Sequence, residues 1–179
     1  MNIVRGAQIV METWCALFCL LAAFTVDYGK KAEVQENVEL GYMLAINTIL
    51  LIADSLAILF RGESGLGGRI MVYVSNNIIF FCMYLLAFMS SKYVLTLLKR
   101  RDVEVSPMFL KVANAIFAGS VILLVLNIFF GFLFYIDSDN FYHRGQWWIV
   151  SQIPGALVMA MCLIVAIVFS KRFTLFEGL

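Results

Sequence analysis

Five long runs of apolar residues constrain the fold of this chain more than any other feature. They cover residues 6–26, 40–60, 70–91, 112–136 and 145–170. The first two runs contain one charged residue each, Glu12 and Asp54, and the other three contain none. A helix that crosses a bilayer needs roughly 20 predominantly apolar residues, and each run is that long. Because backbone groups in lipid must bond within their own segment, and the runs lack the alternation of barrel strands, they predict membrane-spanning helices.

The composition excludes several other classes of protein. Hydrophobic residues make up 63% of the 179 residues and charged residues 14%, whereas soluble domains have roughly a quarter charged. The 13 basic and 12 acidic residues leave a net charge of +1, which gives no electrostatic attraction for nucleic acid. An ordinary soluble enzyme and a disordered chain are excluded as well. We therefore predict an all-α polytopic membrane bundle, a single membrane domain over 1–179, with five transmembrane helices at about 6–26, 40–60, 70–98, 112–136 and 146–170.

The first run has an alternative interpretation as a cleaved signal peptide. Arg5 precedes it, and residues 14–24 resemble the apolar region of such a peptide. The small-residue cleavage pattern is poor, however, and Glu12 comes early in the run. These features favour a helix that is retained.

Basic residues in the loops predict the orientation, because they collect on the cytoplasmic side. With five spans, one side receives nine of them: Lys30, Lys31, Lys92, Lys99, Arg100, Arg101, Lys111, Lys171 and Arg172. The other side receives four: Arg5, Arg61, Arg69 and Arg144. We therefore expect the N-terminus outside and the C-terminus in the cytoplasm. Trp147 and Trp148 fit the aromatic belt at the outer start of the fifth helix.

The polar residues inside the runs share one depth. They are Glu12, Asp54, Asn76, Asn77, Asn127 and Gln152. At 1.5 Å per residue, all lie within roughly 9 to 14 Å of the predicted outer ends of their helices. Because a charge at mid-bilayer costs at least ~2.5 kcal/mol, such groups usually face the bundle interior or a wet cavity. The layer predicts either an outward-opening ligand pocket or a set of interhelical hydrogen bonds worth ~0.6 kcal/mol each.

Helical spacing adds three smaller expectations. Asn47 and Asp54 are seven residues apart and share a helix face. Tyr73, Asn77 and Tyr84 form one stripe, which is more typical of packing than of a ligand site. Pro154 and Gly155 predict a kink in the fifth helix, which acts as a hinge or stays a static bend.

No pattern in the sequence predicts catalysis, a metal or a cofactor. The cysteines Cys15, Cys19, Cys82 and Cys162 lack zinc-site spacing and are expected to be buried. His143 is the only histidine. The glycine-rich segment 61–69 lacks the ending of a phosphate-binding loop and is expected to be a flexible turn. Residues 137–140 lack calcium-loop spacing and are expected to form a solvated turn.

Two stretches carry a family resemblance. The first runs through residues 37–44, 53–55, 60–62, 73–77 and 91–94, and the second through 134–137 and 140–145. Together they resemble the N-terminal membrane-embedded sensory regions of bacterial diguanylate cyclases with a GGDEF domain and of related sensor histidine kinases. The resemblance implies site residues at Asp54, at Asn76 or Asn77, and at Tyr142, Arg144 and Gly145. It also implies two further helices and a cytoplasmic output domain beyond Leu179, in which case this chain is a truncated piece, an excised region or a stand-alone relative.

The expected function is a sensory or receptor-like module in the bacterial cytoplasmic membrane. It would bind an unknown small ligand at its outer face, would have no catalytic activity of its own, and could form a homodimer. A small transporter or channel component is the first alternative, although the charges are confined to the outer third and no inverted repeat is evident. A structural accessory subunit is the second alternative.

Overall fold

The computed structural model describes residues 3–28 and 35–169. In chain order its elements are α1 (Ile3–Tyr28), α2 (Gln35–Leu59), α3 (Leu66–Lys99), α4 (Met108–Phe130), β1 (Phe134–Ile136), β2 (Tyr142–Arg144) and α5 (Trp148–Val168). All five helices are long and apolar enough to cross a membrane. The predicted all-α, multi-pass bundle is therefore confirmed, while its orientation stays a prediction. Lys30, Lys31, Lys171, Arg172 and the C-terminal residues 170–179 lie outside the described residues.

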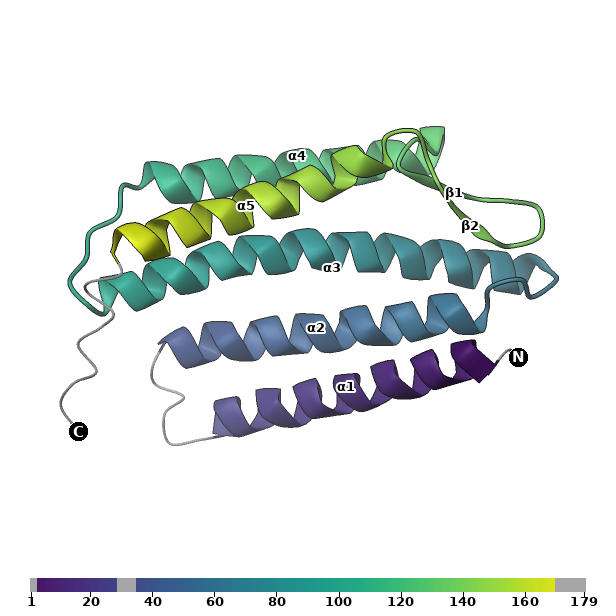
Figure 1. Cartoon of the computed structure of the whole chain (residues 1–179), viewed down its shortest axis with the longest axis horizontal. Helices are drawn as coiled ribbons and strands as arrows, with labels where there is room; N and C mark the ends of the chain where they lie inside the picture. Colours follow the sequence, from purple (N-terminus) through teal and green to yellow (C-terminus); the bar gives the residue numbers. More distant parts are fainter. Residues whose placement is uncertain (1–2, 29–34, 170–179) are drawn as a thin grey trace.

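The helix α3 lies at the centre of the bundle. It packs against α2, which packs against α1, while α4 and α5 pack on its other side (Figure 1). With 34 residues it is about 51 Å long, and it continues past Ser91 as predicted. Neighbouring helices in the chain run in opposite directions, so the start of α1, the end of α2 and the start of α3 lie at the same end of the bundle as the β-hairpin. We call this the hairpin end.

The β-hairpin is the main departure from the prediction. The fourth helix was expected to run to Ile136, but α4 ends at Phe130. Gly131 follows in the left-handed conformation, with φ 62°, and its N–H bonds to the carbonyl of Asn127. Glycine at this position is a common helix end, because no Cβ opposes that backbone conformation. The next residues form β1, which pairs antiparallel with β2 in the register Phe134 with Arg144 and Ile136 with Tyr142.

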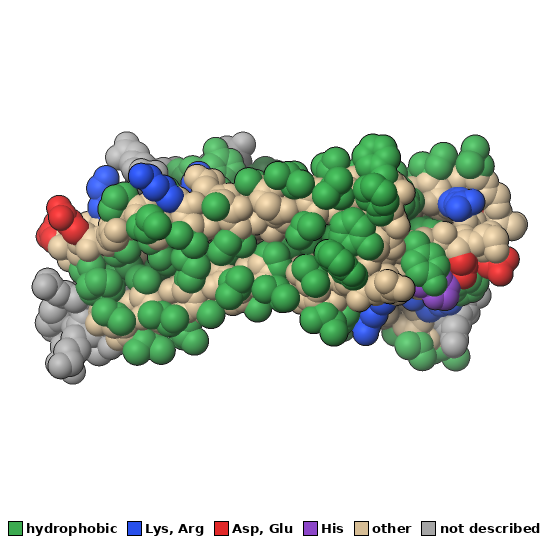
Figure 2. All heavy atoms as spheres, turned by 90° about the horizontal axis from the view of Figure 1, so that it is seen from above, with side chains coloured by type: hydrophobic (Ala, Val, Ile, Leu, Met, Phe, Trp, Pro, Cys, Tyr) green, Lys and Arg blue, Asp and Glu red, His purple; other side chains and the backbone are tan. Residues whose placement is uncertain are grey.

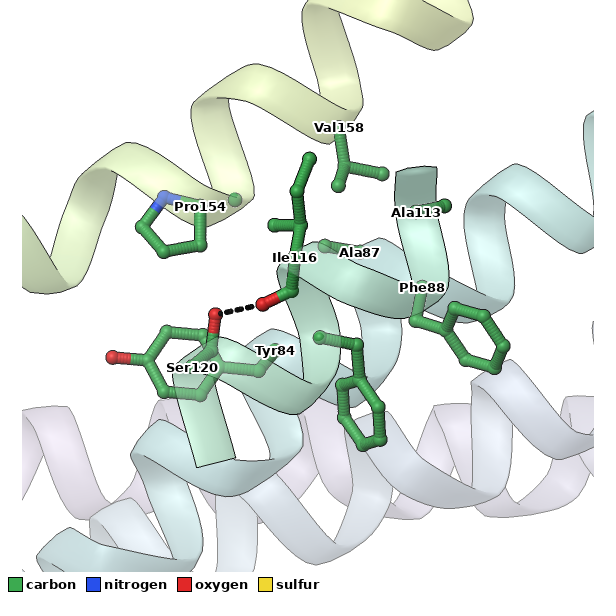
Figure 3. A pocket seen from close by; sticks show the side chains of 10 residues that line it. Tyr84, Ala87, Phe88, Ala113, Ile116, Ser120, Pro154 and Val158 are labelled. Atoms are coloured by element: carbon green, nitrogen blue, oxygen red, sulfur yellow. Dashed lines mark hydrogen bonds between the residues drawn. The ribbon is translucent and has the colours of Figure 1, made fainter. Parts of the chain in front are cut away.

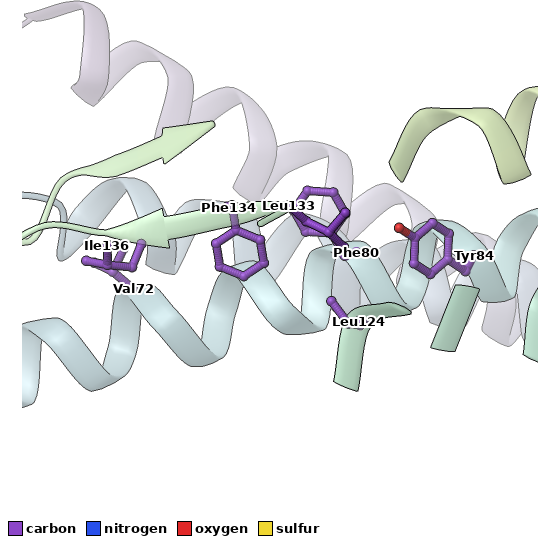
Figure 4. Close-up of a cluster of buried hydrophobic side chains, with 7 residues drawn as sticks. All are labelled: Val72, Phe80, Tyr84, Leu124, Leu133, Phe134 and Ile136. Carbon is purple, nitrogen blue, oxygen red and sulfur yellow. The ribbon is translucent and has the colours of Figure 1, made fainter. Parts of the chain in front are cut away.

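The apolar core runs along α3 in two clusters. At the hairpin end, Phe134 of β1 is fully buried and stacks on Phe80 of α3, with the ring centroids 5.2 Å apart (Figure 4). Val72 and Leu124 complete this contact from α3 and α4. The second cluster, near the other end, contains Ala87, Phe109, Val158 and Cys162. The hairpin therefore closes one end of the helical core.

The surface is that of a membrane-spanning bundle. Figure 2 shows hydrophobic side chains along the middle of the molecule and charged side chains at its two ends. The expectation of four buried cysteines is wrong for one of them. Cys82 and Cys162 are buried and Cys19 is half-buried, but Cys15 is exposed. The reason is that α1 packs mainly on α2, which leaves much of its surface uncovered.

Candidate functional site

A pair of carboxyl groups lies between α1 and α2 near the hairpin end. Glu12 of α1 is 6% exposed. Its Oε1 accepts a hydrogen bond from Nε2 of Gln8 at 2.8 Å, and its Oε2 accepts one from Oγ of Ser55 at 3.1 Å. The carboxyl group of Asp54 on α2 also hydrogen-bonds to Glu12. Two of the predicted site residues, from different helices, are therefore in direct contact.

This contact requires a proton. An ionised carboxylate can only accept hydrogen bonds, so two bonded carboxyl groups must share one proton. Both oxygens of Glu12 already accept bonds from Gln8 and Ser55. A proton on one of the two groups makes this contact a hydrogen bond between them. One charge is removed in this way, which lowers the cost of placing two acidic residues inside apolar spans.

The predicted shared face of Asn47 and Asp54 is confirmed. Asn47 donates from Nδ2 to the sulfur of Cys19 at 3.2 Å, and Asp54 reaches Glu12. Both partners belong to α1. The polar face of α2 is thus directed at α1, and not at a cavity shared by all five helices.

Arg61 connects this carboxyl pair to the hairpin. It lies two residues beyond the end of α2, and it is half-buried. Its positive charge acts on the carboxyl group of Asp54 and also on the hydroxyl of Tyr142 in β2. Its backbone carbonyl accepts a long hydrogen bond of 3.4 Å from Nη1 of Arg5. Its Nε atom is buried and has no hydrogen-bond partner among the described residues.

On the hairpin side, Tyr142, Arg144 and Trp148 form a second part of the site. The indole N–H of Trp148 donates to the hydroxyl of Tyr142. The guanidinium of Arg144 lies 3.9 Å from the centre of the Trp148 ring, a cation–π contact. Burial raises the pKa of Tyr142 above its usual value, although the Trp148 bond and the charges of Arg144 and Arg61 act in the opposite direction. Tyr142 therefore stays protonated and polar at neutral pH.

Asn140 fastens the hairpin to the loop between α2 and α3. Its side chain is 3% exposed, and its Nδ2 donates to the carbonyls of Glu63 and Gly65. Its own carbonyl accepts from the N–H of Gly62 at 3.1 Å. The expected solvated turn at residues 137–140 is thus wrong for Asn140, because the α2–α3 loop covers it.

Residues 138 and 139 of that turn are exposed, and the half-buried Asp137 holds the turn. Its Oδ1 accepts from the N–H groups of Phe141 at 2.8 Å and Asp139 at 3.0 Å. Its Oδ2 lies 2.6 Å from Nε2 of His143. The N–H of Phe141, and then the bond to His143, lower the pKa of Asp137 below its usual value. The carboxylate therefore orders the turn when it is ionised.

The four predicted amide residues do not join the carboxyl pair. Asn76 and Asn77 donate to carbonyls of their own helix, those of Val72 at 2.7 Å and Tyr73 at 2.9 Å. Gln152 donates to Ser151 at 2.9 Å. The structure therefore does not form one pocket from all six polar residues. Equal depth did not bring them together, because α4 and α5 lie across α3 from α1 and α2.

Asn127 has a structural partner in the hairpin. It is 1% exposed, and its Oδ1 accepts from the N–H groups of Leu133 at 2.6 Å and Phe134 at 3.3 Å. Its Nδ2 donates to the carbonyl of Phe134 at 3.2 Å. One amide group thus supplies hydrogen bonds to the backbone where the chain turns back into the bundle.

Pro154 lies in α5, which continues as a helix on both sides of it. With Gly155 it borders a cavity of about 10 Å³, into which Tyr84 and Ser120 also project (Figure 3). This is space for about one water molecule. In the predicted stripe on α3, Tyr84 belongs to the buried core and Tyr73 packs against it, as expected of a packing stripe. Tyr73 and Asn77 also line a groove towards α4.

Sequence reasoning missed Arg61, Asn140 and Trp148 as members of the site. Arg61 and Asn140 were interpreted as parts of turns, and Trp148 as a membrane-interface residue. One signal was available, namely that Arg61 immediately follows the apolar run 40–60, which carries Asp54. Among residues 3–28 and 35–169, no three His, Cys, Asp or Glu side chains are grouped so that they could hold a metal ion.

Comparisons with known proteins do not identify the chain. No family model, no curated protein and no solved structure matches it. The site is therefore defined by its own residues, the Glu12–Asp54 pair and the hairpin residues Tyr142 and Arg144, with Arg61 between them.

Proposed function

We propose that this protein is a membrane-embedded sensory module that binds a small organic anion at the hairpin end. The observation that carries the proposal is the buried Nε of Arg61, which has no hydrogen-bond partner among the described residues. A buried donor without a partner costs about 1–3 kcal/mol. A carboxylate or phosphate is the acceptor that suits a guanidinium group best. An anion at Arg61 would therefore recover this cost.

The position of Arg61 supports a signalling role for such a ligand. Its charge acts on Asp54 of α2 and on Tyr142 of the hairpin, which belong to opposite sides of α3. A bound anion would weaken the effect of the Arg61 charge on both Asp54 and Tyr142. It would therefore favour one arrangement of the hairpin against the α2–α3 loop over another. A ligand with different affinities for two packings shifts their populations. The long helix α3 would carry this shift to the other end of the bundle.

The proposal also includes the cellular setting that the sequence resemblance implies. The module would reside in the bacterial cytoplasmic membrane with the hairpin end outside, as in sensory regions that precede diguanylate cyclase or histidine kinase domains. Homodimer formation would belong to the same mechanism. The positions that the resemblance singles out include Gly145, where an added Cβ would clash with the carbonyl oxygen of Phe132. Glycine is therefore needed there to bring the chain back to α5.

Thermal unfolding of the full chain in lipid nanodiscs tests the proposal. The probes are acetate, succinate, glutamate and inorganic phosphate. At least one should raise the Tm of the wild type and leave that of Arg61→Gln unchanged. Lys99→Gln, at the opposite end of α3, is the matched control and should respond like the wild type. If no probe raises the Tm, or if Arg61→Gln responds fully, the proposal fails.

Proton-coupled transport is a second candidate function. It is favoured by the hydrogen-bonded carboxyl pair Glu12–Asp54 within the spans, because protonatable carboxyl groups inside membranes often belong to proton pathways. Proteoliposomes loaded with a pH-sensitive dye distinguish the two functions. A transporter acidifies the lumen when an anion gradient is applied, and Asp54→Asn abolishes this. A sensory module binds the anion without moving protons.

A further inference from the structure

A groove between α3 and α4 opens at the hairpin end and is separate from the Arg61 site. Its outer part has a volume of about 500 Å³ and is bordered by Arg69, Ile70 and Tyr135. Its inner part has a volume of about 400 Å³ and is bordered by Asn77, Phe81 and Val125. Tyr73, Val74 and Ile128 line both parts. The two volumes are therefore parts of one groove.

Two contacts between α3 and α4 close the groove, one at its back and one at its inner end. The hydroxyl of Tyr73 donates a long hydrogen bond of 3.5 Å to the carbonyl of Ile128, which ties α3 to α4. Below it, the rings of Phe81 and Phe117 meet with their centroids 6.2 Å apart. Phe81 lies twelve residues beyond Arg69 in α3, which corresponds to a depth of about 18 Å. Half the hydrocarbon thickness of a bilayer is ~15 Å, so the groove is as deep as one leaflet.

The walls of the inner part of the groove are apolar and incompletely covered by protein. Val74 is 46% exposed and Val125 is 48% exposed. In a bilayer the groove lies beside the acyl chains of one leaflet, and hydrocarbon is the material that fills apolar space at that depth. The amide of Asn77 is the polar exception on these walls, because its Oδ1 is buried without a hydrogen-bond partner. A ligand that hydrogen-bonded to this amide oxygen would need a hydrogen-bond donor about 12 Å below Arg69.

Arg69 gives the mouth of the groove a positive charge. It lies in the first turn of α3 and is exposed. No carboxylate forms a salt bridge with it among the described residues. The partial positive charge of a helix N-terminus adds to that of the guanidinium. A cation at the membrane surface, directly above an apolar groove of one-leaflet depth, complements a lipid with an anionic headgroup.

We propose that this groove binds one anionic phospholipid, with an acyl chain between α3 and α4 and the headgroup phosphate on Arg69. The proposal is independent of the Arg61 site, because none of the groove residues belongs to it. A basic residue at the surface contributes ~1 kcal/mol to binding of anionic lipid, which corresponds to about fivefold. Phosphatidylglycerol should therefore be retained about fivefold more than phosphatidylcholine.

Native mass spectrometry of the full chain, released from nanodiscs that contain equal amounts of these two lipids, measures the preference. Arg69→Gln should remove it. Arg5→Gln is the control at the same end, because Arg5 lies in α1 and does not border the groove. The proposal is overturned if wild type retains both lipids equally or if Arg69→Gln keeps the preference.

A second pair of variants tests the acyl chain. Val125→Trp should fill the inner groove and displace the lipid, whereas Leu126→Trp should have no effect, since Leu126 is also partly exposed but lies outside the groove. Asn77→Leu should retain the lipid or bind it more tightly. Loss of binding in Asn77→Leu, or full displacement of the lipid by inorganic phosphate, would show a polar or anionic ligand and overturn the proposal. Circular dichroism of each variant confirms that it is folded.

Discussion

Replacing Asn127 with leucine should detach the β-hairpin from the bundle. Leucine has the same number of side-chain heavy atoms as asparagine, branched at the same position, but cannot hydrogen-bond. The change would leave the N–H groups of Leu133 and Phe134 and the carbonyl of Phe134 without their present partner. These groups are buried, since Leu133 and Phe134 are both 0% exposed.

The magnitude follows from the individual bonds. A buried backbone group that loses its partner costs about 1–3 kcal/mol. The 2.6 Å bond to Leu133 is the strongest of the three, whereas the bonds of 3.3 and 3.2 Å to Phe134 are weaker. We therefore expect Asn127→Leu to lower the free energy of unfolding by about 2–5 kcal/mol, which is a large part of the stability of a typical domain.

Unfolding in mixed micelles, followed by tryptophan fluorescence, measures this loss, because Trp147 and Trp148 lie beside the hairpin. Asn76→Leu is the matched control. Asn76 is also buried, at 8% exposure, but its amide donates only to a carbonyl of its own helix. It should cost less than about 1 kcal/mol. Equal losses in the two variants, or a loss below 1 kcal/mol for Asn127→Leu, would refute the structural role given to Asn127.

Three further predictions concern the glycines, the carboxyl pair and the turn. Gly145→Ala should lower the free energy of unfolding by about 1–3 kcal/mol, because the added Cβ clashes with Phe132. Gly119→Ala, where the added Cβ meets open space, should instead stabilise α4 by about 1 kcal/mol. The same unfolding assay compares the two variants. Asp54→Asn should change the Tm little, since an amide N–H can replace the acid O–H, whereas Asp54→Leu should lower it; equal Tm losses would contradict the shared proton. Because the pKa of Asp137 is lowered in the folded protein, its carboxylate stabilises the turn fully above its ordinary pKa of about 3.8. This contribution is lost as the pH falls through the lower pKa of the folded state. Hydrogen exchange at the N–H of Phe141 should accelerate over that range, and Asp137→Asn should not show this acid dependence.

The number of helices could be predicted from the sequence because the bilayer fixes a minimum length for each span. The ends were harder to predict, as α4 shows. An apolar run continues from Phe130 through Ile136, and hydropathy does not distinguish a helix from a short buried strand. Gly131 was the local sign of the helix end. The reason the strand is buried lies in α3, where Phe80 provides its partner.

The site could be predicted only in part, because sequence gives depth and helix face but not which helices are neighbours. Glu12 and Asp54 meet because α1 packs on α2. Asn127 and Gln152 have the same depth but lie across α3. Arg61 has its role through contacts with residues distant in sequence, from Arg5 to Tyr142, and no periodic pattern reports such contacts.

The central position of α3 has a mechanical consequence. The pairs α1–α2 and α4–α5 pack on opposite sides of α3, and the bonds of Asn140 to the α2–α3 loop connect the two sides at the hairpin end. Loss of these bonds would separate the hairpin from the α2–α3 loop, and the packing on α3 would then hold the two pairs together.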